Sequence, residues 1–351
     1  LNHKNNRVIQ MENDWEILLF ITDLPSILSG TKIGFIDPHE DHFNKGPRER
    51  RTGYRWHLRK DRENMNRIPD QFLPYKRIFD CTEEVFLEGR YRGTLFRFPL
   101  RTEPSELSQT LYSDEKVEHL FASFCADAHF VLLFLQHLES VELFVREKSE
   151  SEPRKIFQVQ ISHESLALVR EKRRKFYDAI TPGERMAEPV TVTYPLTMVV
   201  QFPDENVERH SYLVTSYCIG GEVSSKFEKL LIDKELSYLP SVGVAMAIPS
   251  ESTSETPNIQ GHVFCALPLP MQKKSLTGLP VHVNGFFSLS QNRRHIKTPN
   301  ADQEDKAKLT DKSLLWNTCL LEEALPQAYS TLIKEATDQR NYNVPPDAIY
   351  R

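Results

Sequence analysis

Apolar and polar residues alternate along several stretches in the second half of the chain, which is the period of a strand with one buried face. The alternation is clear from Val263 to Leu267 and resumes at Val281. Pro268 is expected to end the first of these strands because proline cannot donate to a ladder. Asn284-Gly285 predicts a turn after the second. The same rhythm predicts further strands over residues 140–146, 155–162, 190–201, 210–218 and 242–248.

A group of apolar residues stands directly ahead of a charged tripeptide. Phe286, Phe287 and Leu289 precede Asn292-Arg293-Arg294. Large aromatic side chains favour a core position, whereas two adjacent positive charges favour solvent. We therefore expect the rings, at least one of them fully buried, to anchor a hairpin that presents the arginines at its tip.

The first part of the chain has fewer clear elements. An apolar run predicts a strand over 15–20, followed by a break and a second short strand that Pro25 and Gly30 punctuate. Residues 93–100 alternate strictly and predict another strand. Residues 37–70 are rich in charge and predict a long mobile loop.

Helical spacing and cap residues predict the helices. Apolar residues recur at helical spacing over 114–138. Thr102-Glu103-Pro104-Ser105-Glu106 has the composition of a helix start, so we predict a helix over 105–111 and a domain boundary before it. The pattern also predicts a short helix near 224–234, a flexible polar insertion at 250–260, a charged linker at 299–312 and a closing helix at 314–336.

Four long motifs carry a family resemblance. They are Thr277–Phe287 with Asn292-Arg293-Arg294, Ile21–Gly30, Gly34–His39 and Gly93–Arg101. In their order along the chain, over about residues 21 to 335, these motifs resemble the sacsin repeat family, which is related to the gyrase, heat-shock-chaperone, histidine-kinase and MutL ATPases.

The resemblance implies an α+β fold. Residues 15–102 would form the rear part of an ATPase α/β sandwich and residues 105–300 a mixed-sheet domain of the middle type. A closing helix would follow at 313–340, and 1–14 and 341–351 would be flexible tails.

The resemblance also implies a nucleotide site, which this chain matches only in part. Members of the superfamily hold ATP and magnesium with an asparagine and an acid, an Asp-x-Gly-x-Gly loop and a glycine-rich lid. None of the 13 glycines here forms a Gly-x-Gly. Only Gly93 and Thr94 match family positions, which lie beneath the adenine. We expect no cofactor for this chain, whereas intact members would bind ATP and magnesium.

Composition and short motifs also limit which kinds of binding or catalytic site we expect in this chain. A net charge of −5 gives no general electrostatic reason to bind nucleic acid. The five cysteines contain no C-x-x-C, which favours a cytoplasmic protein with reduced thiols and gives no support for a zinc site. Asp37–His42 contains metal-ligand types, but no rigid element fixes them, so we expect no metal site. No Gly-x-Ser-x-Gly elbow is present, and the longest apolar run, 130–135, is too short to span a membrane.

Three functions remain open. The first is a sacsin-like chaperone, co-chaperone or scaffold module that contacts client or co-chaperone proteins, with self-association through an exposed sheet edge. The second is a part of an ATP-dependent chaperone whose nucleotide site lies outside this chain. The third is a nucleic-acid or phosphoprotein binder that uses Asn292, Arg293 and Arg294, because arginine forks suit phosphates. The basic run Arg170–Lys175 is expected to be a solvated helix end or loop.

Overall fold

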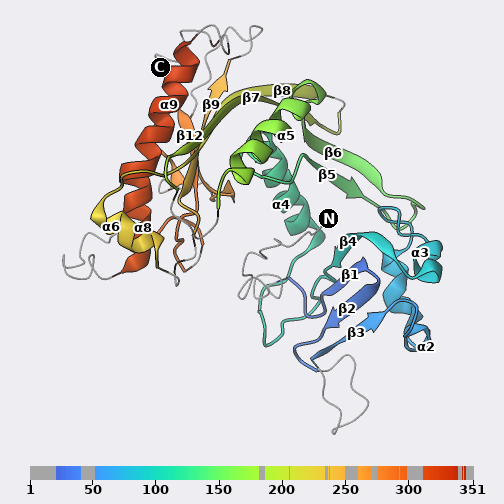
Figure 1. Ribbon diagram of the computed structural model, residues 1–351. Coiled ribbons are helices and arrows are strands. Elements are labelled where there is room, and N and C mark those ends of the chain that lie inside the picture. Colours follow the sequence, from blue (N-terminus) through green and yellow to red (C-terminus); the bar gives the residue numbers. More distant parts are fainter. Residues whose placement is uncertain are drawn as a thin grey trace. The chain divides into compact units, whose positions relative to one another are not determined.

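A computed structural model describes residues 21–40, 52–181, 186–204, 206–233, 236, 238–249, 260–270, 275–291, 293–298, 311–338, 342 and 344. The chain is mixed α/β with two separate sheets (Figure 1). It divides into two compact units, the first formed by Leu1–Phe124 and Phe144–Arg154 and the second by Cys125–Leu143 and Lys155–Arg351. This arrangement is compatible with the predicted α+β fold class, whereas the strand predicted over 15–20 lies outside the described residues.

The first unit contains a four-stranded antiparallel sheet in the order β3-β2-β1-β4. Its strands are β1 (Ser26–Gly30), β2 (Lys32–Ile36), β3 (Gly53–His57) and β4 (Tyr91–Arg97). The short strand between Pro25 and Gly30 and the strand near 93–100 are thus confirmed.

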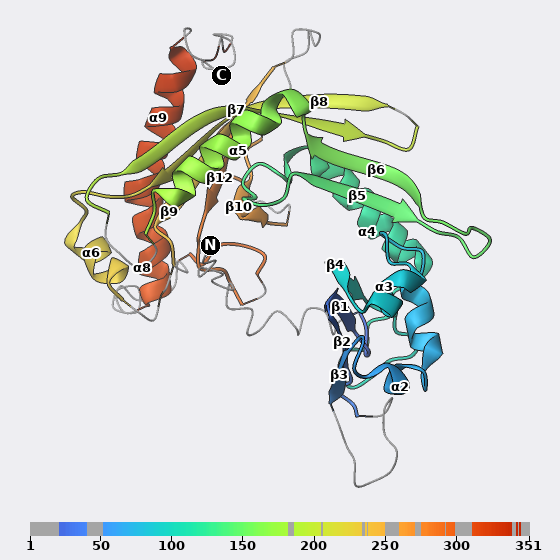
Figure 2. The ribbon, with the colours of Figure 1, turned by 45° about the vertical axis from the view of Figure 1, so that its right-hand side comes forward.

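One face of this sheet is covered by short helices. These are α2 (Arg62–Met65), the 3₁₀ helix η1 (Pro69–Tyr75) and α3 (Glu83–Glu88) (Figure 2). Leu28, Ile33 and Phe35 from the sheet form one apolar cluster with Met65 and Phe72 from the helices. The prediction of a long mobile loop over 37–70 is wrong for its described second half, because the charged residues alternate with apolar ones that reach this core.

Two helix predictions need correction around residue 105. Residues 105–111 form no helix. The Ser105 hydroxyl accepts from the Leu107 N–H at 3.3 Å and also donates to Asp23 Oδ1 at 2.8 Å, which ties this segment to a distant part of the chain. The helix predicted over 114–138 is α4 (Asp114–Asp127), and a 3₁₀ turn, η2 (Ala128–Phe130), follows it. Leu132 and its neighbour Leu133 are fully buried, and their carbonyls accept from Arg173, so these carbonyls do not serve a continuing helix.

The second unit contains an eight-stranded sheet in the order β11-β10-β12-β9-β8-β7-β6-β5. From β11 to β7, and between β7 and β6, neighbouring strands pair antiparallel except β10 with β12, which pair parallel. Its strands are β5 (Ser140–Val145), β6 (Arg154–Ile161), β7 (Val190–Gln201), β8 (Val207–Cys218), β9 (Ser241–Ile248), β10 (Val263–Cys265), β11 (Leu267–Pro268) and β12 (Val281–Gly285). The five strands predicted between residues 140 and 248 are confirmed.

Two turn predictions near β12 are wrong. Pro268 does not end the first strand; it pairs with Phe264 as part of the two-residue strand β11. Asn284 and Gly285 continue β12 and pair with Gly243 and Val242 of β9, so they make no turn. A Cβ on Gly285 would lie 2.7 Å from the Phe287 ring, so close ring packing requires glycine here.

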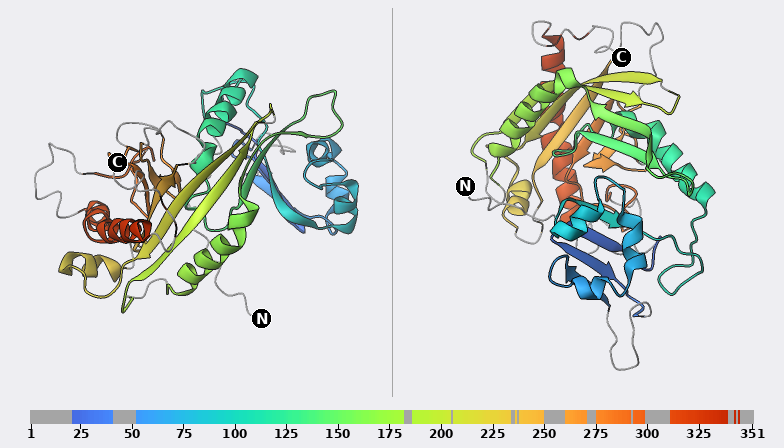
Figure 3. Two further views of the ribbon diagram at one scale, coloured as in Figure 1. Left: turned by 90° about the horizontal axis from the view of Figure 1, so that it is seen from above. Right: turned by 90° about the vertical axis from the view of Figure 1, so that its right-hand side faces the viewer.

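Helices cover both faces of the eight-stranded sheet (Figures 2 and 3). The helix α5 (His163–Asp178) lies on one face, and α9 (Leu325–Thr337) lies on the other. The closing helix that was predicted over 314–336 is confirmed as α8 (Lys312–Cys319), a π turn η4 (Leu320–Ala324) and α9. The short helix α6 (Ser225–Leu231) confirms the one predicted near 224–234.

The main core lies between the sheet and the closing helix. Its sheet side includes Leu213, Val244 and Val281, and its helix side includes Leu320 and Leu332, each at most 1 % exposed. No helix among the described residues is both long and apolar enough to cross a bilayer.

Candidate functional site

The two residues that match family nucleotide positions lie on β4, which is one edge of the described four-stranded sheet. Gly93 and Thr94 are both exposed. The hydroxyls of Thr94 and Ser29 are 2.7 Å apart and share a hydrogen bond across the strand pair. The hydroxyl of Thr94 thus has a partner within the sheet.

The arginine tip belongs to the other unit. Arg293 and Arg294 are exposed, and Asn292 lies outside the described residues. A bridge between Leu289 and Ile296 closes the hairpin below them. The main chain of Arg293 has a φ of 54° and its N–H donates to the Ser290 carbonyl at 2.8 Å, which makes a tight turn at the tip. The anchored hairpin expected from the sequence is therefore present, with Phe287 only 3 % exposed beneath it.

An acid and an arginine join distant segments of the first unit. The guanidinium of Arg101 donates to both oxygens of Asp23, with the shortest contact at 2.6 Å. These hydrogen bonds, together with that from Ser105, hold the pKa of Asp23 below its usual value against the opposing effect of burial. His39 Nε2 lies 3.7 Å from the same carboxylate. The ion pair therefore joins these segments of the first unit. No three His, Cys, Asp or Glu residues in the described chain are grouped as a metal ion requires.

Four histidines from four segments gather in the second unit. The rings of His129 and His210 have centroids 4.8 Å apart, and those of His262 and His282 stack with centroids 5.6 Å apart. Phe130 contacts both His262 and His282, with its ring centroid 5.3 Å from each. The cluster thus ties the turn after α4 to the sheet through aromatic contacts.

Burial keeps three of these histidines, His129, His262 and His282, neutral. Burial, together with the neighbouring histidines, lowers the pKa of His129 to about 4 and that of His282 to about 3. The pKa of His262 is also lowered by burial, against the opposing charge of Asp127. His210 instead lies 2.9 Å from a Glu208 oxygen. The group is therefore sensitive to acid.

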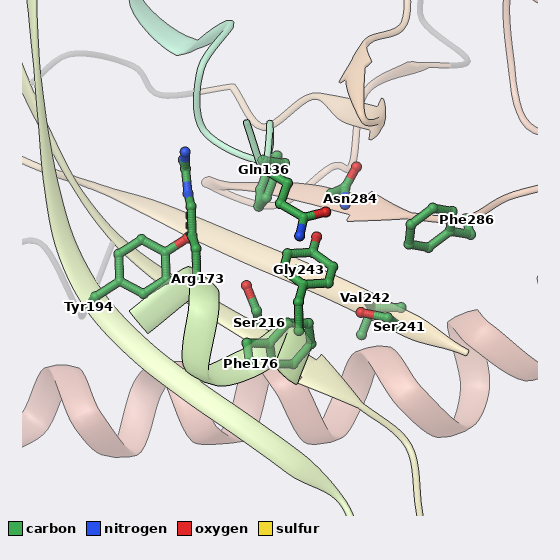
Figure 4. A pocket seen from close by; sticks show the side chains of 12 residues that line it. Gln136, Arg173, Phe176, Tyr194, Ser216, Ser241, Val242, Gly243, Asn284 and Phe286 are labelled. Carbon is green, nitrogen blue, oxygen red and sulfur yellow. Dashed lines mark hydrogen bonds between the residues drawn. The ribbon is translucent and has the colours of Figure 1, made fainter. Parts of the chain in front are cut away.

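A pocket opens on the α5 face of the same unit, at the ends of β9 and β12 (Figure 4). Its cavity volume is only about 20 Å³, which is room for roughly one water molecule. Side chains reach it from the segment after η2, from α5 and from four strands (Figure 4). They belong to Phe134, Gln136, Arg173, Phe176, Tyr177, Tyr194, Ser216, Ser241, Val242 and Asn284, with Gly243 and Phe286 completing the lining.

The floor of the pocket depends on a glycine. A Cβ on Gly243 would lie 2.9 Å from the ring of Phe134, so a larger residue would push this ring off the sheet. Arg173 forms the inner wall and is 7 % exposed. It donates to the carbonyls of Leu132 at 2.8 Å and Leu133 at 3.2 Å. These bonds fix the segment that forms the rim.

Comparison with known proteins identifies the family. A family model described as the Sacsin domain matches residues 15–158. Human sacsin is 40% identical over 329 residues. The chain carries a sacsin repeat region. The match covers 90% of this chain and 7% of human sacsin, so this sacsin region spans a small part of the relative's length.

The sequence did not indicate the pocket or the histidine cluster of this sacsin region. Their residues are scattered over more than 150 positions, so no local motif joins them. One signal was available for α5: Ser162 accepts from the Ser165 N–H as an N-cap, and Val169, Arg173 and Phe176 recur at helical spacing. The basic run 170–175 lies within this helix rather than in a loop.

Proposed function

We propose that this sacsin repeat region acts through contacts with other proteins, as a chaperone, co-chaperone or scaffold module, and does not hydrolyse ATP by itself. The observation that carries the proposal is the environment of Thr94. This exposed residue lies on the edge strand β4, and its hydroxyl shares a hydrogen bond with Ser29 on the neighbouring strand β1. A nucleotide site needs converging amides or cations for phosphate and oxygen ligands for magnesium. Gly93 and Thr94 lie on a β-strand. The hydrogen bond between the hydroxyls of Thr94 and Ser29 provides neither phosphate ligands nor magnesium ligands.

The proposal also relates the two sheets to the domains that the family resemblance implies. We propose that the four-stranded sheet with helices on one face would be the rear part of an ATPase-type sandwich and the eight-stranded sheet a middle-type domain. The 40% identity to human sacsin over most of this chain supports membership of the sacsin repeat family.

Protein contacts have a candidate surface at the β4 edge. The side chain of Phe96 is 53 % exposed and stacks on Phe98, with ring centroids 6.1 Å apart. Exposed apolar rings beside an edge strand favour pairing with another chain. The partner would be a client protein, a co-chaperone or a second copy.

Ligand-dependent melting tests the nucleotide half of the proposal. A ligand that binds the folded state raises its melting temperature by mass action. We expect no shift with millimolar Mg-ATP or Mg-ADP. A reproducible rise of several degrees that Thr94→Val abolishes would overturn this half and restore an ATPase role.

Aggregation assays test the protein-contact half. We expect substoichiometric to stoichiometric amounts of the chain to reduce light scattering from heat-unfolded citrate synthase. The Phe96→Ser variant should be weaker, whereas Thr191→Ser, an exposed change on β7, serves as the control. Absence of any effect of the wild-type chain on scattering, at a tenfold excess, would contradict the proposal.

A second candidate function uses the arginine hairpin. Arg293 and Arg294 are both exposed at a tight turn, where guanidinium groups suit phosphate oxygens. Binding to an oligonucleotide or a phosphopeptide should then weaken with salt and with Arg294→Ala. Binding that is independent of salt would exclude this role.

A further inference from the structure

The helix α4 carries an apolar stripe that is largely open to solvent. Val117, Leu120, Phe121 and Phe124 recur at i, i+3, i+4 and i+7, so they share one side of the helix. Leu120 is 57 % exposed and Phe121 is 39 % exposed, and none of the 14 residues of α4 is buried. These four residues, the α4 stripe, therefore present an apolar surface over the middle of the helix.

A helix of this length gains little stability from its own sequence. Ser113 helps to start α4, because its hydroxyl accepts from the Lys116 N–H at 3.3 Å. Isolated helices of about 12–15 residues are nevertheless marginal in water, and most of the stability of a protein helix comes from the packing of an apolar face. An apolar stripe at helical spacing that stays exposed is therefore better explained by a partner than by chance exposure of single side chains.

The segment around the α4 stripe is strongly acidic. Residues 102–127 contain six acidic residues and one lysine, a net charge of −5 that equals the net charge of the whole chain. Asp114 and Glu118, at i and i+4, flank the stripe on one side, and both are exposed. Neither makes an ion pair within the described part of the chain. The lysine, Lys116, donates to the Leu111 carbonyl at 2.9 Å.

This charge favours one kind of partner. A second copy would bring two acidic segments together, and the apolar run 15–20 of this chain is itself accompanied by Glu12, Asp14 and Glu16. Nucleic acids and anionic membranes would also be repelled. A polypeptide helix with lysine or arginine beside its own apolar face would be attracted, and its apolar repeat would match that of the α4 stripe.

We propose that the α4 stripe docks an amphipathic helix with basic flanks, contributed by a client or co-chaperone protein. The inference rests on the proposed function, because it names the kind of partner that a protein-binding module would take. The apolar face of the partner helix would pack on the stripe, and its lysines or arginines would pair with Asp114 and Glu118. This surface is additional to the β4 edge.

A designed peptide tests the surface directly. The probe is a fluorescein-labelled peptide of about 18 residues, with leucines at i, i+3, i+4 and i+7 and lysines elsewhere. Fluorescence anisotropy should show saturable binding to the intact chain. A peptide of the same composition in scrambled order, and one with glutamate in place of each lysine, should each bind at least tenfold more weakly. Equal binding of the scrambled peptide would mean general charge attraction and would overturn the proposal.

Three variants locate the site. Leu120→Ser should weaken binding of the lysine peptide at least tenfold, whereas Ala122→Ser, an exposed change on the opposite side of the same helix, should leave it unchanged. Glu118→Lys should weaken binding of the lysine peptide and strengthen binding of the glutamate peptide, each at least threefold. Binding that neither Leu120→Ser nor Glu118→Lys alters would overturn the assignment.

Stability and molecular mass show whether the stripe is free in the isolated chain. Because Leu120 is more than half exposed, the Leu120→Ser and Ala122→Ser variants should melt within about 1 °C of each other. A fall of several degrees in Leu120→Ser would mean that the stripe packs within the chain. A dimer in sedimentation that Leu120→Ser dissociates would make a second copy the occupant. Either result would overturn the proposal.

Aggregation of unfolded citrate synthase separates this inference from the proposed function. If the wild-type chain reduces scattering but does not bind the lysine peptide, the α4 stripe is not a docking site although the module function stands. If the wild-type chain has no effect on scattering but binds the peptide with the expected response to the variants, the proposed function fails and the docking surface stands.

Discussion

The indole N–H of Trp316 donates a hydrogen bond of 2.8 Å to the main-chain carbonyl of Phe286. The next residue, Asn317, accepts from the Ser288 N–H at 2.8 Å and donates to the carbonyls of Ser288 and Lys297 at 2.8 and 2.9 Å. The first turns of the closing helix thus hold both strands at the base of the arginine hairpin. The base of the hairpin is therefore held both by the aromatic rings expected from the sequence and by Trp316 and Asn317 of the closing helix.

The Asn317 contacts predict a large loss of stability on truncation. Asn317 is 2 % exposed, so Asn317→Ala would leave buried main-chain groups without partners. We expect the free energy of unfolding to fall by about 3 kcal/mol. Gln327→Ala, an exposed change on α9, should change it by less than about 0.5 kcal/mol. Urea unfolding of the three chains measures both values, and similar losses in the two variants would contradict the clamp.

The hairpin predicts a contrast between its base and its tip. Phe287 is 3 % exposed, and Phe287→Ala should cost about 3–5 kcal/mol. Arg293→Ala and Arg294→Ala should each change stability by less than about 0.5 kcal/mol, because both side chains are exposed. Thermal melts of the single variants test this. A comparable loss from either arginine would mean that the tip is held by an ion-pair network.

Two glycines near β10 form a matched pair. A Cβ on Gly261 would lie 1.9 Å from the Val281 carbonyl oxygen and 2.3 Å from Thr277 Oγ1, so Gly261→Ala must displace main chain. We expect a loss of at least about 3 kcal/mol. Gly278 has a φ of +73° but open space around it, so Gly278→Ala should cost only about 1 kcal/mol of backbone strain. Equal melting temperatures for the two variants would contradict this ranking.

The histidine cluster predicts loss of stability in mild acid. The pKa of His282 is about 3 in the folded chain, against 6.5 for an unperturbed histidine, so the unfolded chain binds the proton first. Stability is therefore full above pH 6.5 and falls as the pH decreases below it, by about 2 kcal/mol at pH 5 for His282 alone. His129 and His262 act in the same direction, while Asp127 opposes the effect at His262.

A variant without this titrating ring separates the cluster from other acid effects. His282→Phe keeps a ring among Phe130, Phe264 and Tyr212 and should flatten the dependence of unfolding free energy on pH between 6.5 and 5. The control is His163→Phe at the exposed start of α5, which should leave the slope unchanged. An unchanged slope in His282→Phe would show that this histidine does not couple protonation to folding.

The strands from 140 to 248 could be predicted because each buries one face, so alternation alone marks them. The hairpin of β7 and β8 pairs Val190 with Cys218 through to Gln201 with Val207, a regular register that needs no long-range information. The helix at 105–111 could not be judged locally. Ser105 has the right type to cap a helix and its hydroxyl accepts from the Leu107 N–H, but it also donates to Asp23, 82 residues earlier, and the segment follows that contact without forming a helix.

The candidate site was less predictable because it too depends on contacts between residues that are far apart in the sequence. Gly285 follows Asn284 as in a turn, yet the glycine is required by the ring of Phe287 that packs on it. Pocket residues such as Gln136 and Ser216 carry no pattern of their own, because their role depends on which segments the sheet brings together. Motif resemblance located Arg293 and Arg294 correctly at a tip but carried no information about the pocket on the α5 face.

The π turn at Leu320–Ala324 has a bearing on how relatives are aligned with this chain. A π turn accommodates one residue more than an α turn without breaking the helix. The clamp residues Trp316 and Asn317 precede it, and the sheet-facing residues Ala328 and Leu332 follow it. A homologue one residue shorter in this turn could therefore present both sets on unchanged sides of a plain α-helix. A one-residue gap at this point is compatible with conservation of both contacts, whereas the same gap within α9 would turn the sheet-facing stripe away from its partner.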